Sequence, residues 1–191
     1  MIYLLRHGQT EFNAQGRLQG HVDSNLTEKG VDQARAMGRA LSRLIDDPTE
    51  WRIAVSPLGR AQATAGLVAE ALPGVRLDIE FRLIEVSFGA YDGRLRSELE
   101  AEHPGAFGPT GWAFRTEMGE PYDAARARVG NWLSDLAPEP ARKVIAVTHG
   151  ITSRVLRGVY ADLTLDNVVS LPVPQDAFYR LQDRQIIRIE V

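Results

Sequence analysis

The chain has 191 residues, of which 44% are hydrophobic and 25% charged, and its formal net charge is −3. This ordinary globular composition excludes an intrinsically disordered chain, and the length suffices for one domain with a full hydrophobic core. The acidic balance, with no block of Lys or Arg, argues against a nucleic-acid-binding surface. Cysteine is absent, which excludes disulfides, thiolate catalysis and Cys-ligated zinc.

The first elements alternate between strand and helix. Residues 2–5 form a short apolar run typical of a buried strand. Arg6-His7 interrupts this run far short of a signal peptide or a membrane span, so we expect a cytoplasmic protein. After a polar stretch over residues 8–25, Thr27 has the features of an N-cap, and apolar residues keep helical spacing as far as Ile45.

A second strand and helix follow. Residues 52–55 predict the strand, and Ser56 as cap with Pro57 at the first helical position predicts a helix that extends to Leu72. Residues 77–79 give a weaker strand signal.

The second half begins with an irregular region rich in Gly and Pro, residues 88–121, which contains one short helical piece around residues 98–103. Next come an amphipathic helix, the clearest strand of the chain, a further helix and a hairpin that turns at Asp183-Arg184. They occupy residues 122–136, 144–147, 151–159, and 178–181 with 186–189. This alternation predicts an α/β fold, a three-layer αβα sandwich with a mainly parallel central sheet. We expect a single domain over residues 1–191 with a small lid-like insertion at about 88–121.

Three segments place a cationic or titratable side chain directly after a predicted strand. They are Arg6-His7, Ser56 to Arg60, and His149-Gly150. Parallel strands end at one edge of a sheet, where ligands bind in open α/β folds, so these segments should converge. Arg60 and His149-Gly150 also fall at predicted helix starts, whose free N–H groups and positive partial charge suit a phosphate. An arginine at that place is unfavourable unless an anion binds beside it.

Simpler interpretations exist for each residue taken alone. An Arg-His pair after a strand is more often a surface feature, and His149 is equally compatible with a hydrogen-bonded histidine at a strand end. His21 and His103 lie in polar or loop segments and are expected at the surface. Two histidines could ligate a metal, but neither has an Asp or Glu at a typical ligand spacing, so no metal is expected.

The segment Leu5–Asn13 (LRHGQTEFN) resembles the signature of the histidine phosphatase superfamily, the phosphoglycerate-mutase-like enzymes. The resemblance continues in the same order as in the family and spans residue 2 to about residue 156. The matching blocks are Gly16–Gly20 (GRLQG), Asp23, Leu26-Thr27, Gly30, Gln33-Ala34, Ser56–Ala65 (SPLGRAQATA), Leu83–Gly93 (LIEVSFGAYDG) and Val147–Gly150 (VTHG). That combination is highly specific.

Three departures from the family pattern stand out. Asp92 stands where Glu is common, which should be nearly neutral. Residues 119–121 (GEP) replace a usual Gly-Glu-Ser, and Ile151 stands where Gly or Asn is frequent. The last two concern the substrate pocket and leave the phosphoryl chemistry intact.

The resemblance implies that His7 is the nucleophile, with Arg6, Arg60 and His149 holding the charge of the transferred phosphoryl group. Elementary chemistry agrees, because only a neutral imidazole can attack phosphorus and nearby guanidinium groups disfavour the protonated ring. Glu85 would protonate the leaving alcohol and then activate water; otherwise it is an exposed turn carboxylate. Secondary phosphate or substrate contacts are expected from Thr10, Asn13, Gln19, Gly20 and Gly150.

We therefore expect a metal-independent phosphomonoester hydrolase without a cofactor, acting through a phosphohistidine on a small phosphorylated metabolite. The alternatives are a cofactor-dependent phosphoglycerate mutase-type phosphotransferase and a non-catalytic phosphoryl-ligand binding module. The chain looks shorter than the family's glycolytic mutases, and residues 98–118 and the tail hold few Lys or Arg for a second phosphate.

The leaving-group site and the partners are less defined. The side chains of Phe88, Trp112, Phe114 and Met118 could shape an apolar leaving-group site or equally form the core of the insertion. The expected partner is a small-molecule phosphoester, with no nucleic acid and no membrane, and a homodimer stays open.

Overall fold

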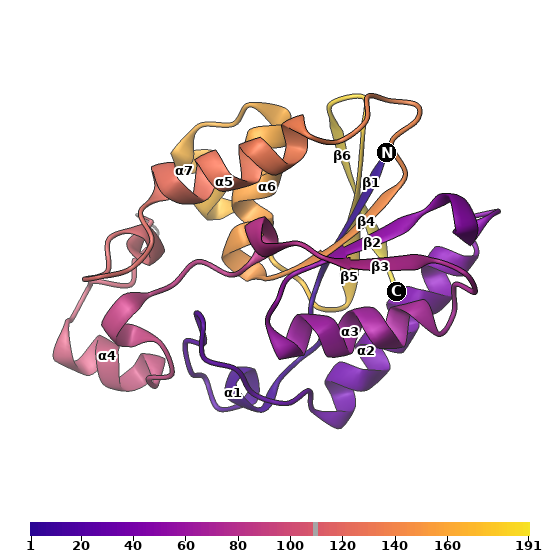
Figure 1. The fold of residues 1–191 in the computed structure, drawn as a ribbon. Coiled ribbons are helices and arrows are strands. Elements are labelled where there is room, and N and C mark those ends of the chain that lie inside the picture. The colour runs from indigo at the N-terminus through magenta and orange to yellow at the C-terminus, as the bar shows by residue number, and fades with distance from the viewer. Residues whose placement is uncertain (109–110) are drawn as a thin grey trace.

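A computed structural model describes residues 1–108 and 111–191; residues 109 and 110, inside the predicted insertion, lie outside the described residues. Its centre is a six-stranded sheet in the order β3-β2-β4-β1-β5-β6 (Figure 1). The strands are β1 (Ile2–Arg6), β2 (Arg52–Val55), β3 (Arg76–Ile79), β4 (Val144–Thr148), β5 (Ala177–Gln182) and β6 (Gln185–Glu190).

The sheet is mainly parallel, as predicted. β1 to β4 run parallel, and the hairpin β5–β6 adds to β1 in the antiparallel sense. The hairpin turns at Asp183 and Arg184, which adopt left-handed φ angles of 50° and 60°. Such angles match the turn of a two-residue hairpin. The central strands β1 and β4 are buried almost throughout, so they appear as continuous apolar runs in the sequence.

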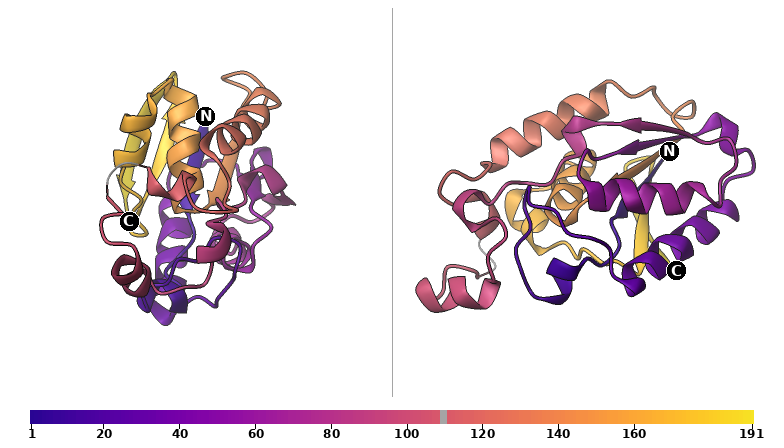
Figure 2. Two further views of the ribbon diagram at one scale, coloured as in Figure 1. Left: turned by 90° about the vertical axis from the view of Figure 1, so that its left-hand side faces the viewer. Right: turned by 60° about the horizontal axis from the view of Figure 1, so that its bottom comes forward.

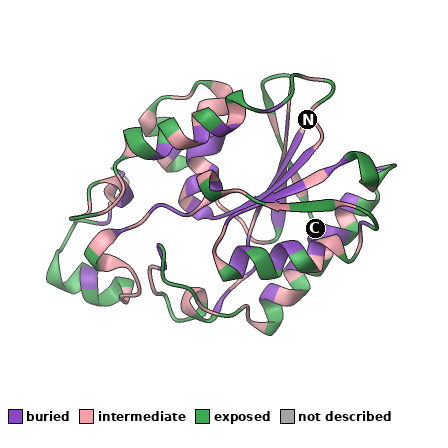
Figure 3. Ribbon diagram, viewed as in Figure 1, coloured by how far each residue is buried: buried purple, intermediate pink, exposed green. Residues whose placement is uncertain are grey.

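Helices cover both faces of the sheet and complete the predicted three layers (Figures 1 and 2). One face carries α2 (Glu28–Ser42) and α3 (Gly59–Ala69). The other carries α5 (Tyr122–Ser134), α6 (Gly150–Ala161) and α7 (Leu165–Ser170). Each face has its own core, because alternate residues of one strand point to opposite sides: Tyr3 and Leu5 belong to the α2–α3 core, and Ile2 and Leu4 to the other. Figure 3 shows this buried centre and the exposed outer faces of the helices.

Some element boundaries differ from the prediction. Helix α3 begins at Gly59 and not at Pro57, because Leu58 is its N-cap and Ser56 is used elsewhere. The short helices α1 (Glu11–Ala14) and α7 were not predicted; each is shorter than two apolar repeats of a helix, so periodicity gives little signal. In the described part of the chain, no helix combines the length and the apolar character that a membrane crossing needs.

The described part of the insertion contains α4 (Arg96–Glu102) and several 3₁₀ turns, and it extends away from the sheet in Figure 1. Its aromatic side chains pack on one another, with Trp112 centred 4.9 Å from Phe107 and 5.3 Å from Phe88. Phe88 and Trp112 also line a cavity, so they contribute both to the core of the insertion and to a cavity wall. Met118 serves neither, because it is 88% exposed.

Candidate active site

The three predicted functional segments meet at one edge of the sheet. β1 and β2 both pair with β4, which places Arg6 opposite Thr148 and Val55 opposite Val147. The pairing continues past the strand ends, because His7 N–H donates to Thr148 O and Ser56 N–H to Val147 O, both at 3.0 Å. The predicted convergence therefore follows directly from parallel pairing.

A cavity of about 270 Å³ opens at this edge. Eight of the ten predicted site residues line it: Arg6, His7, Asn13, Gln19, Gly20, Arg60, Glu85 and Gly150. The other two, Thr10 and His149, are fully buried and do not line it. The wall is completed by Arg17, Leu18, Phe88, Arg96, Trp112, Ile151, Arg154 and Val173.

His7 is 2% exposed, and its ring has a defined hydrogen-bond partner. Nδ1 lies 2.8 Å from the carbonyl oxygen of Gly8. A carbonyl only accepts, so Nδ1 carries the proton and Nε2 of the neutral ring carries the lone pair. Burial, and then the guanidinium groups of Arg6 and Arg60, lower the pKa of His7 well below its usual value. The ring is therefore a neutral base at physiological pH.

The rings of His149 and His7 are neighbours, with centroids 5.1 Å apart and planes inclined at 57°. Its Nε2 is 2.6 Å from Ser56 Oγ, whereas its Nδ1 is buried without a partner among the described residues. Leu58 N–H already donates to Ser56 Oγ, so the serine proton can serve Nε2 and leave His149 protonated at Nδ1. Burial and the charge of Arg60 lower the pKa of His149 well below its usual value.

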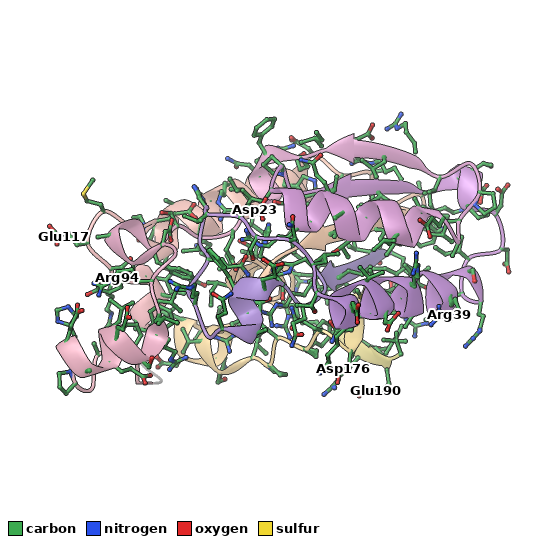
Figure 4. The ribbon with its side chains drawn as sticks, turned by 90° about the horizontal axis from the view of Figure 1, so that it is seen from below. Asp23, Arg39, Arg94, Glu117, Asp176 and Glu190 are labelled. Carbon is green, nitrogen blue, oxygen red and sulfur yellow. The ribbon has the colours of Figure 1, made fainter. Side chains whose placement is uncertain are left out.

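Arg60 is held by Asp23, a residue that the sequence did not single out for this role. Asp23 Oδ1 accepts from Arg60 Nη1 at 3.0 Å and from Arg60 N–H at 3.3 Å, and Oδ2 accepts from Gly59 N–H. Asp23 thus occupies the positive end of α3, where Figure 4 labels it. The carbonyls of Gly20 and Val22 take two more guanidinium protons, which leaves Nε and one Nη2 proton of Arg60 without a partner among the described residues. The anion expected beside Arg60 is therefore supplied in part by the protein itself.

Arg6 donates from Nη1 to Val173 O at 2.6 Å, and its buried Nε has no partner in the described chain. Burial lowers the pKa of Arg6 to about 10, opposed by Glu85 and assisted by Arg154 and Arg60. The guanidinium group stays charged at neutral pH and retains donors for an anion.

Glu85 is 7% exposed and is therefore not the exposed turn carboxylate of the simpler interpretation. Its carboxylate accepts from the N–H groups of Ile151 at 3.2 Å and Thr152 at 2.9 Å, the first turn of α6. These donors hold the carboxyl group at the cavity wall. The N-terminus of α6 was expected to present such N–H groups to a phosphate, and this expectation is corrected, because Glu85 takes two of them.

The remaining predicted contacts differ in position. Thr10 caps α1, and its hydroxyl accepts from Asn13 N–H at 3.1 Å and from Gln19 Nε2 at 2.7 Å. It can affect a substrate only through Asn13 and Gln19, which line the cavity. Gly20 must be glycine, because its φ is +51° and an added Cβ would lie 1.7 Å from Asp92 Oδ1. Asp92, the shorter acid noted in the sequence, joins the Gly20 loop to the start of the insertion, because it accepts from His21 N–H at 3.1 Å and from Phe88 N–H at 2.8 Å.

Sequence reasoning missed the cations Arg17, Arg96 and Arg154, because it looked for further charge only in residues 98–118 and the tail. It also missed Gln175, whose Nε2 donates to His7 O at 3.2 Å and to Asn13 Oδ1 at 3.1 Å. Helical spacing from Gly150 to Arg154 could have revealed one of these. Within residues 1–108 and 111–191, no cluster of three or more His, Asp or Glu could hold a metal ion.

Known proteins share this architecture and these motifs. The model of the histidine phosphatase superfamily (branch 1) matches residues 2–184. A protein of Erwinia tasmaniensis assigned as phosphoglycerate mutase GpmB is 29% identical over 202 residues, covering 99% of this chain and 84% of its own. A protein of Hydrogenobacter thermophilus assigned as phosphoserine phosphatase 2 is 33% identical over 174 residues, covering 87% and 81%.

Two solved structures are similar over nearly the whole chain. A mycobacterial glucosyl-3-phosphoglycerate phosphatase, solved with VO3, is 27% identical with a TM-score of 0.79, covering 99% of this chain and 96% of its own. YhfR of Bacillus stearothermophilus is 26% identical with a TM-score of 0.79, covering 99% and 95%.

Because the pKa values of the two buried histidines are lowered, the free energy of unfolding should decrease as the pH is lowered. In the unfolded chain each histidine has its ordinary pKa of about 6.5. Below that pH, the unfolded state therefore binds protons that the folded state does not bind. Each histidine should therefore lower the free energy of unfolding by up to about 1.4 kcal/mol for each unit by which the pH is reduced. Urea unfolding at pH 7.5, 6.0 and 5.0 measures this slope.

His7→Gln and His149→Gln should each remove part of the slope. His103→Gln, which deletes an exposed histidine, is the control. A slope that is unchanged in both buried-site variants would show that these histidines are already protonated in the folded protein.

Proposed function

The chain belongs to the histidine phosphatase superfamily, and we propose that it is a metal-independent phosphomonoester hydrolase that forms a phosphohistidine at His7. The observation that carries the proposal is the state of His7: a buried, neutral ring in the cavity wall, protonated at Nδ1 by virtue of its bond to Gly8 O. A nucleophile for phosphorus needs this state, because the lone pair must be on the nitrogen that attacks.

In the first step, His7 Nε2 forms a bond to phosphorus while the bond from phosphorus to the ester oxygen breaks. The ring gains positive charge as it is phosphorylated, and the Gly8 carbonyl opposite Nδ1 stabilises that charge. The ring needs no reorientation, because the same hydrogen bond exists before the reaction.

The arginines stabilise the negative charge on the transferred phosphoryl group. Within residues 1–108 and 111–191, the buried Nε of Arg6 has no partner, and Nε and one Nη2 proton of Arg60 are likewise available. Donors fixed before the reaction stabilise a transition state without reorganisation cost, and guanidinium groups supply the charge that a metal would otherwise provide. His149, protonated at Nδ1, would add one more donor to the phosphoryl oxygens.

Glu85 is the proposed proton donor. A bound phosphate dianion disfavours a second negative charge beside it, so substrate binding favours the protonated carboxyl group. Its proton passes to the leaving oxygen. Water then attacks the phosphohistidine, the carboxylate takes the proton of that water, and inorganic phosphate leaves His7.

Hydrolysis is favoured over phosphoryl transfer to a second alcohol by similarity along the full length to a glucosyl-3-phosphoglycerate phosphatase, with 99% and 96% of the two chains covered. The mutase alternative draws on the GpmB assignment and on the extra arginines of the cavity. Incubation with 3-phosphoglycerate distinguishes them, since a hydrolase releases inorganic phosphate and a mutase yields 2-phosphoglycerate. A binding module without turnover would give neither.

Rapid quench with a ³²P-labelled substrate should give a phosphoprotein that is labile in acid and stable in base. The label should be lost in His7→Ala, because alanine has no nitrogen that could form the bond to phosphorus. His103→Ala, on the exposed surface, is the control and should keep the label. Label that persists in His7→Ala, or that resists acid as a phosphoserine does, contradicts the assignment of His7.

Glu85→Gln should separate the two kinds of leaving group. An alkyl alkoxide needs a proton in the transition state, a contribution typically worth ~10²–10⁴-fold, whereas nitrophenolate leaves without one. The variant should therefore lose the pre-steady-state burst with an alkyl phosphate and largely keep it with p-nitrophenyl phosphate.

The burst is the informative signal, because later attack by water also requires Glu85. Glu117→Gln, an exposed acid of the insertion labelled in Figure 4, is the control. Equal slowing of both bursts in Glu85→Gln would exclude Glu85 as the donor and direct attention to Asp92 or Glu80.

A further inference from the structure

The proposed proton donor lies in a segment without regular secondary structure. Residues 84–88, which contain Glu85, form neither helix nor strand, so the hydrogen bonds of a helix or a sheet do not hold them in place. Side chains hold this segment instead, because the carbonyl oxygens of residues 82–85 each accept a hydrogen bond from a side chain. The four pairs are Arg128 Nη1 to Arg82 O, Thr148 Oγ1 to Leu83 O and Thr152 Oγ1 to Ile84 O, each at 2.7 Å, and His21 Nε2 to Glu85 O at 2.8 Å. The donors come from α5, β4, α6 and the loop before α2, so the position of Glu85 depends on several distant parts of the chain.

Arg128, on α5, supports this segment in two ways. Its Nη1 donates to Arg82 O, and its Nη2 donates to Thr152 Oγ1 at 3.3 Å. An arginine only donates and a carbonyl only accepts, so the Thr152 hydroxyl accepts from Arg128 and gives its proton to Ile84 O. Thr152 also contacts Oε1 of Glu85, through its N–H at 2.9 Å and its hydroxyl at 3.1 Å. Arg128 thus reaches the proton donor through one intermediate residue, although it does not line the active-site cavity itself.

Glu120 holds the guanidinium group of Arg128 in this place. Its Oε1 accepts from Arg128 Nε at 2.6 Å and its Oε2 from Arg128 Nη2 at 2.8 Å, and the two side chains are only 19% and 16% exposed. A bidentate pair of this kind fixes the orientation of the guanidinium group as well as its charge. Glu120 N–H also donates to Ser87 O at 2.9 Å, and we call this junction the base of the insertion. The GEP segment was expected at the substrate pocket, but Glu120 does not line the active-site cavity, and its contacts lead to Arg128 instead.

Arg128 is separate from the groups that bind the phosphate. Arg60 is held by Asp23, and Arg6 donates to Val173 O. Within the described residues, the hydrogen bonds of Arg128 lead to none of these four groups. A change at Arg128 should therefore displace the proton donor and leave the phosphate-binding arginines in place. Such a displacement matters, because an error of about 1 Å in the position of a reacting group can cost about 100-fold in rate.

We propose that Arg128 is a positioning residue for the proton donor and that Glu120, by holding Arg128, links the base of the insertion to protonation of the leaving group. Arg128 holds the segment that carries Glu85, and Glu85 delivers its proton to the ester oxygen. Attack by His7 needs no contact from Arg128, so the effect is confined to leaving groups that require a proton. This proposal rests on the proposed function for the role of Glu85 and adds to it the residues that keep this carboxyl group in place.

Single-turnover release of the alcohol tests the positioning role, with the alkyl esters glycerol 3-phosphate and 3-phosphoglycerate compared with p-nitrophenyl phosphate. Arg128→Met should slow release from the alkyl esters by about 10- to 100-fold and leave release of nitrophenolate nearly unchanged. Arg128→Lys, which keeps the charge but not the planar fork, should slow the alkyl esters less. Arg94→Met is the matched control, because it breaks an ion pair with Glu102 on the insertion, where Figure 4 labels Arg94, and it should change neither rate.

A second variant and a second measurement separate positioning from folding. Because Arg128→Met leaves Glu120 without its partner, the double variant Glu120→Gln with Arg128→Met removes that charge as well and should show the same selective loss. Amide hydrogen exchange then reports the position of Glu85 without turnover. The N–H groups that donate to its carboxylate should exchange about 3- to 10-fold faster, as expected for the loss of one hydrogen bond. A backbone amide of β4, which lies in the centre of the sheet, should be unchanged. The three reporting amides are those of Val86, Ile151 and Thr152.

The outcomes distinguish this proposal from the proposed function. If wild type turns over the esters but the variants slow alkyl and aryl esters equally, or slow neither, the positioning role is overturned and the hydrolase assignment stands. If wild type releases no alcohol from either alkyl ester, amide exchange alone decides the positioning role: faster exchange of the three amides supports it, and unchanged exchange overturns it. Release of nitrophenolate by wild type then decides the hydrolase assignment separately.

Discussion

The hydrogen bond from His7 Nδ1 to the Gly8 carbonyl is the contact on which the account of this site depends. The acceptor is fixed by close packing, because a Cβ on Gly8 would lie 2.2 Å from Gly30 O, and Gly8 N–H donates to Thr64 Oγ1 at 3.1 Å. Only glycine allows the loop to approach the start of α2 so closely. The loop thus holds the Gly8 carbonyl within hydrogen-bond distance of Nδ1, and the ring keeps its lone pair on Nε2. Burial between two arginines then keeps that ring neutral.

Two carboxylates make this concentration of positive charge tolerable. Asp23 binds Arg60 and the first N–H groups of α3, and Glu85 binds the first N–H groups of α6. Charge-assisted bonds of this kind are stronger than neutral ones, and a carboxylate at a helix N-terminus also meets the positive end of the macrodipole. The two acids differ in their surroundings: Asp23 is exposed at the rim, whereas Glu85 lies in the cavity wall. That difference suits a structural role for Asp23 and a proton-transferring role for Glu85.

Much of the fold and of the site follows from the sequence. Apolar runs at 2–5, 52–55 and 144–147 are unambiguous because these strands are buried on both faces, and parallel pairing then brings Arg6, Arg60 and His149-Gly150 together. The sequence predicted a bound phosphate beside Arg60 but did not indicate that the Asp23 carboxylate lies there, because a loop conformation decides which acid reaches a helix end. The start of α3 at Gly59 was missed for a related reason: Ser56 bonds His149, a tertiary contact that competes with capping. Arg154 was missed because its relevance depends on which face of α6 meets the cavity.

Nitrogen-15 NMR of the histidine rings at pH 7 tests the central claim most directly, because it reports the protonation of each ring nitrogen. His7→Gln and His149→Gln assign the signals to the two buried rings. His7 should be neutral, with a protonated Nδ1 and an Nε2 that carries the lone pair. An imidazolium, or a neutral ring protonated at Nε2, would exclude His7 as the nucleophile in this state, since neither form leaves a lone pair on Nε2 to attack phosphorus.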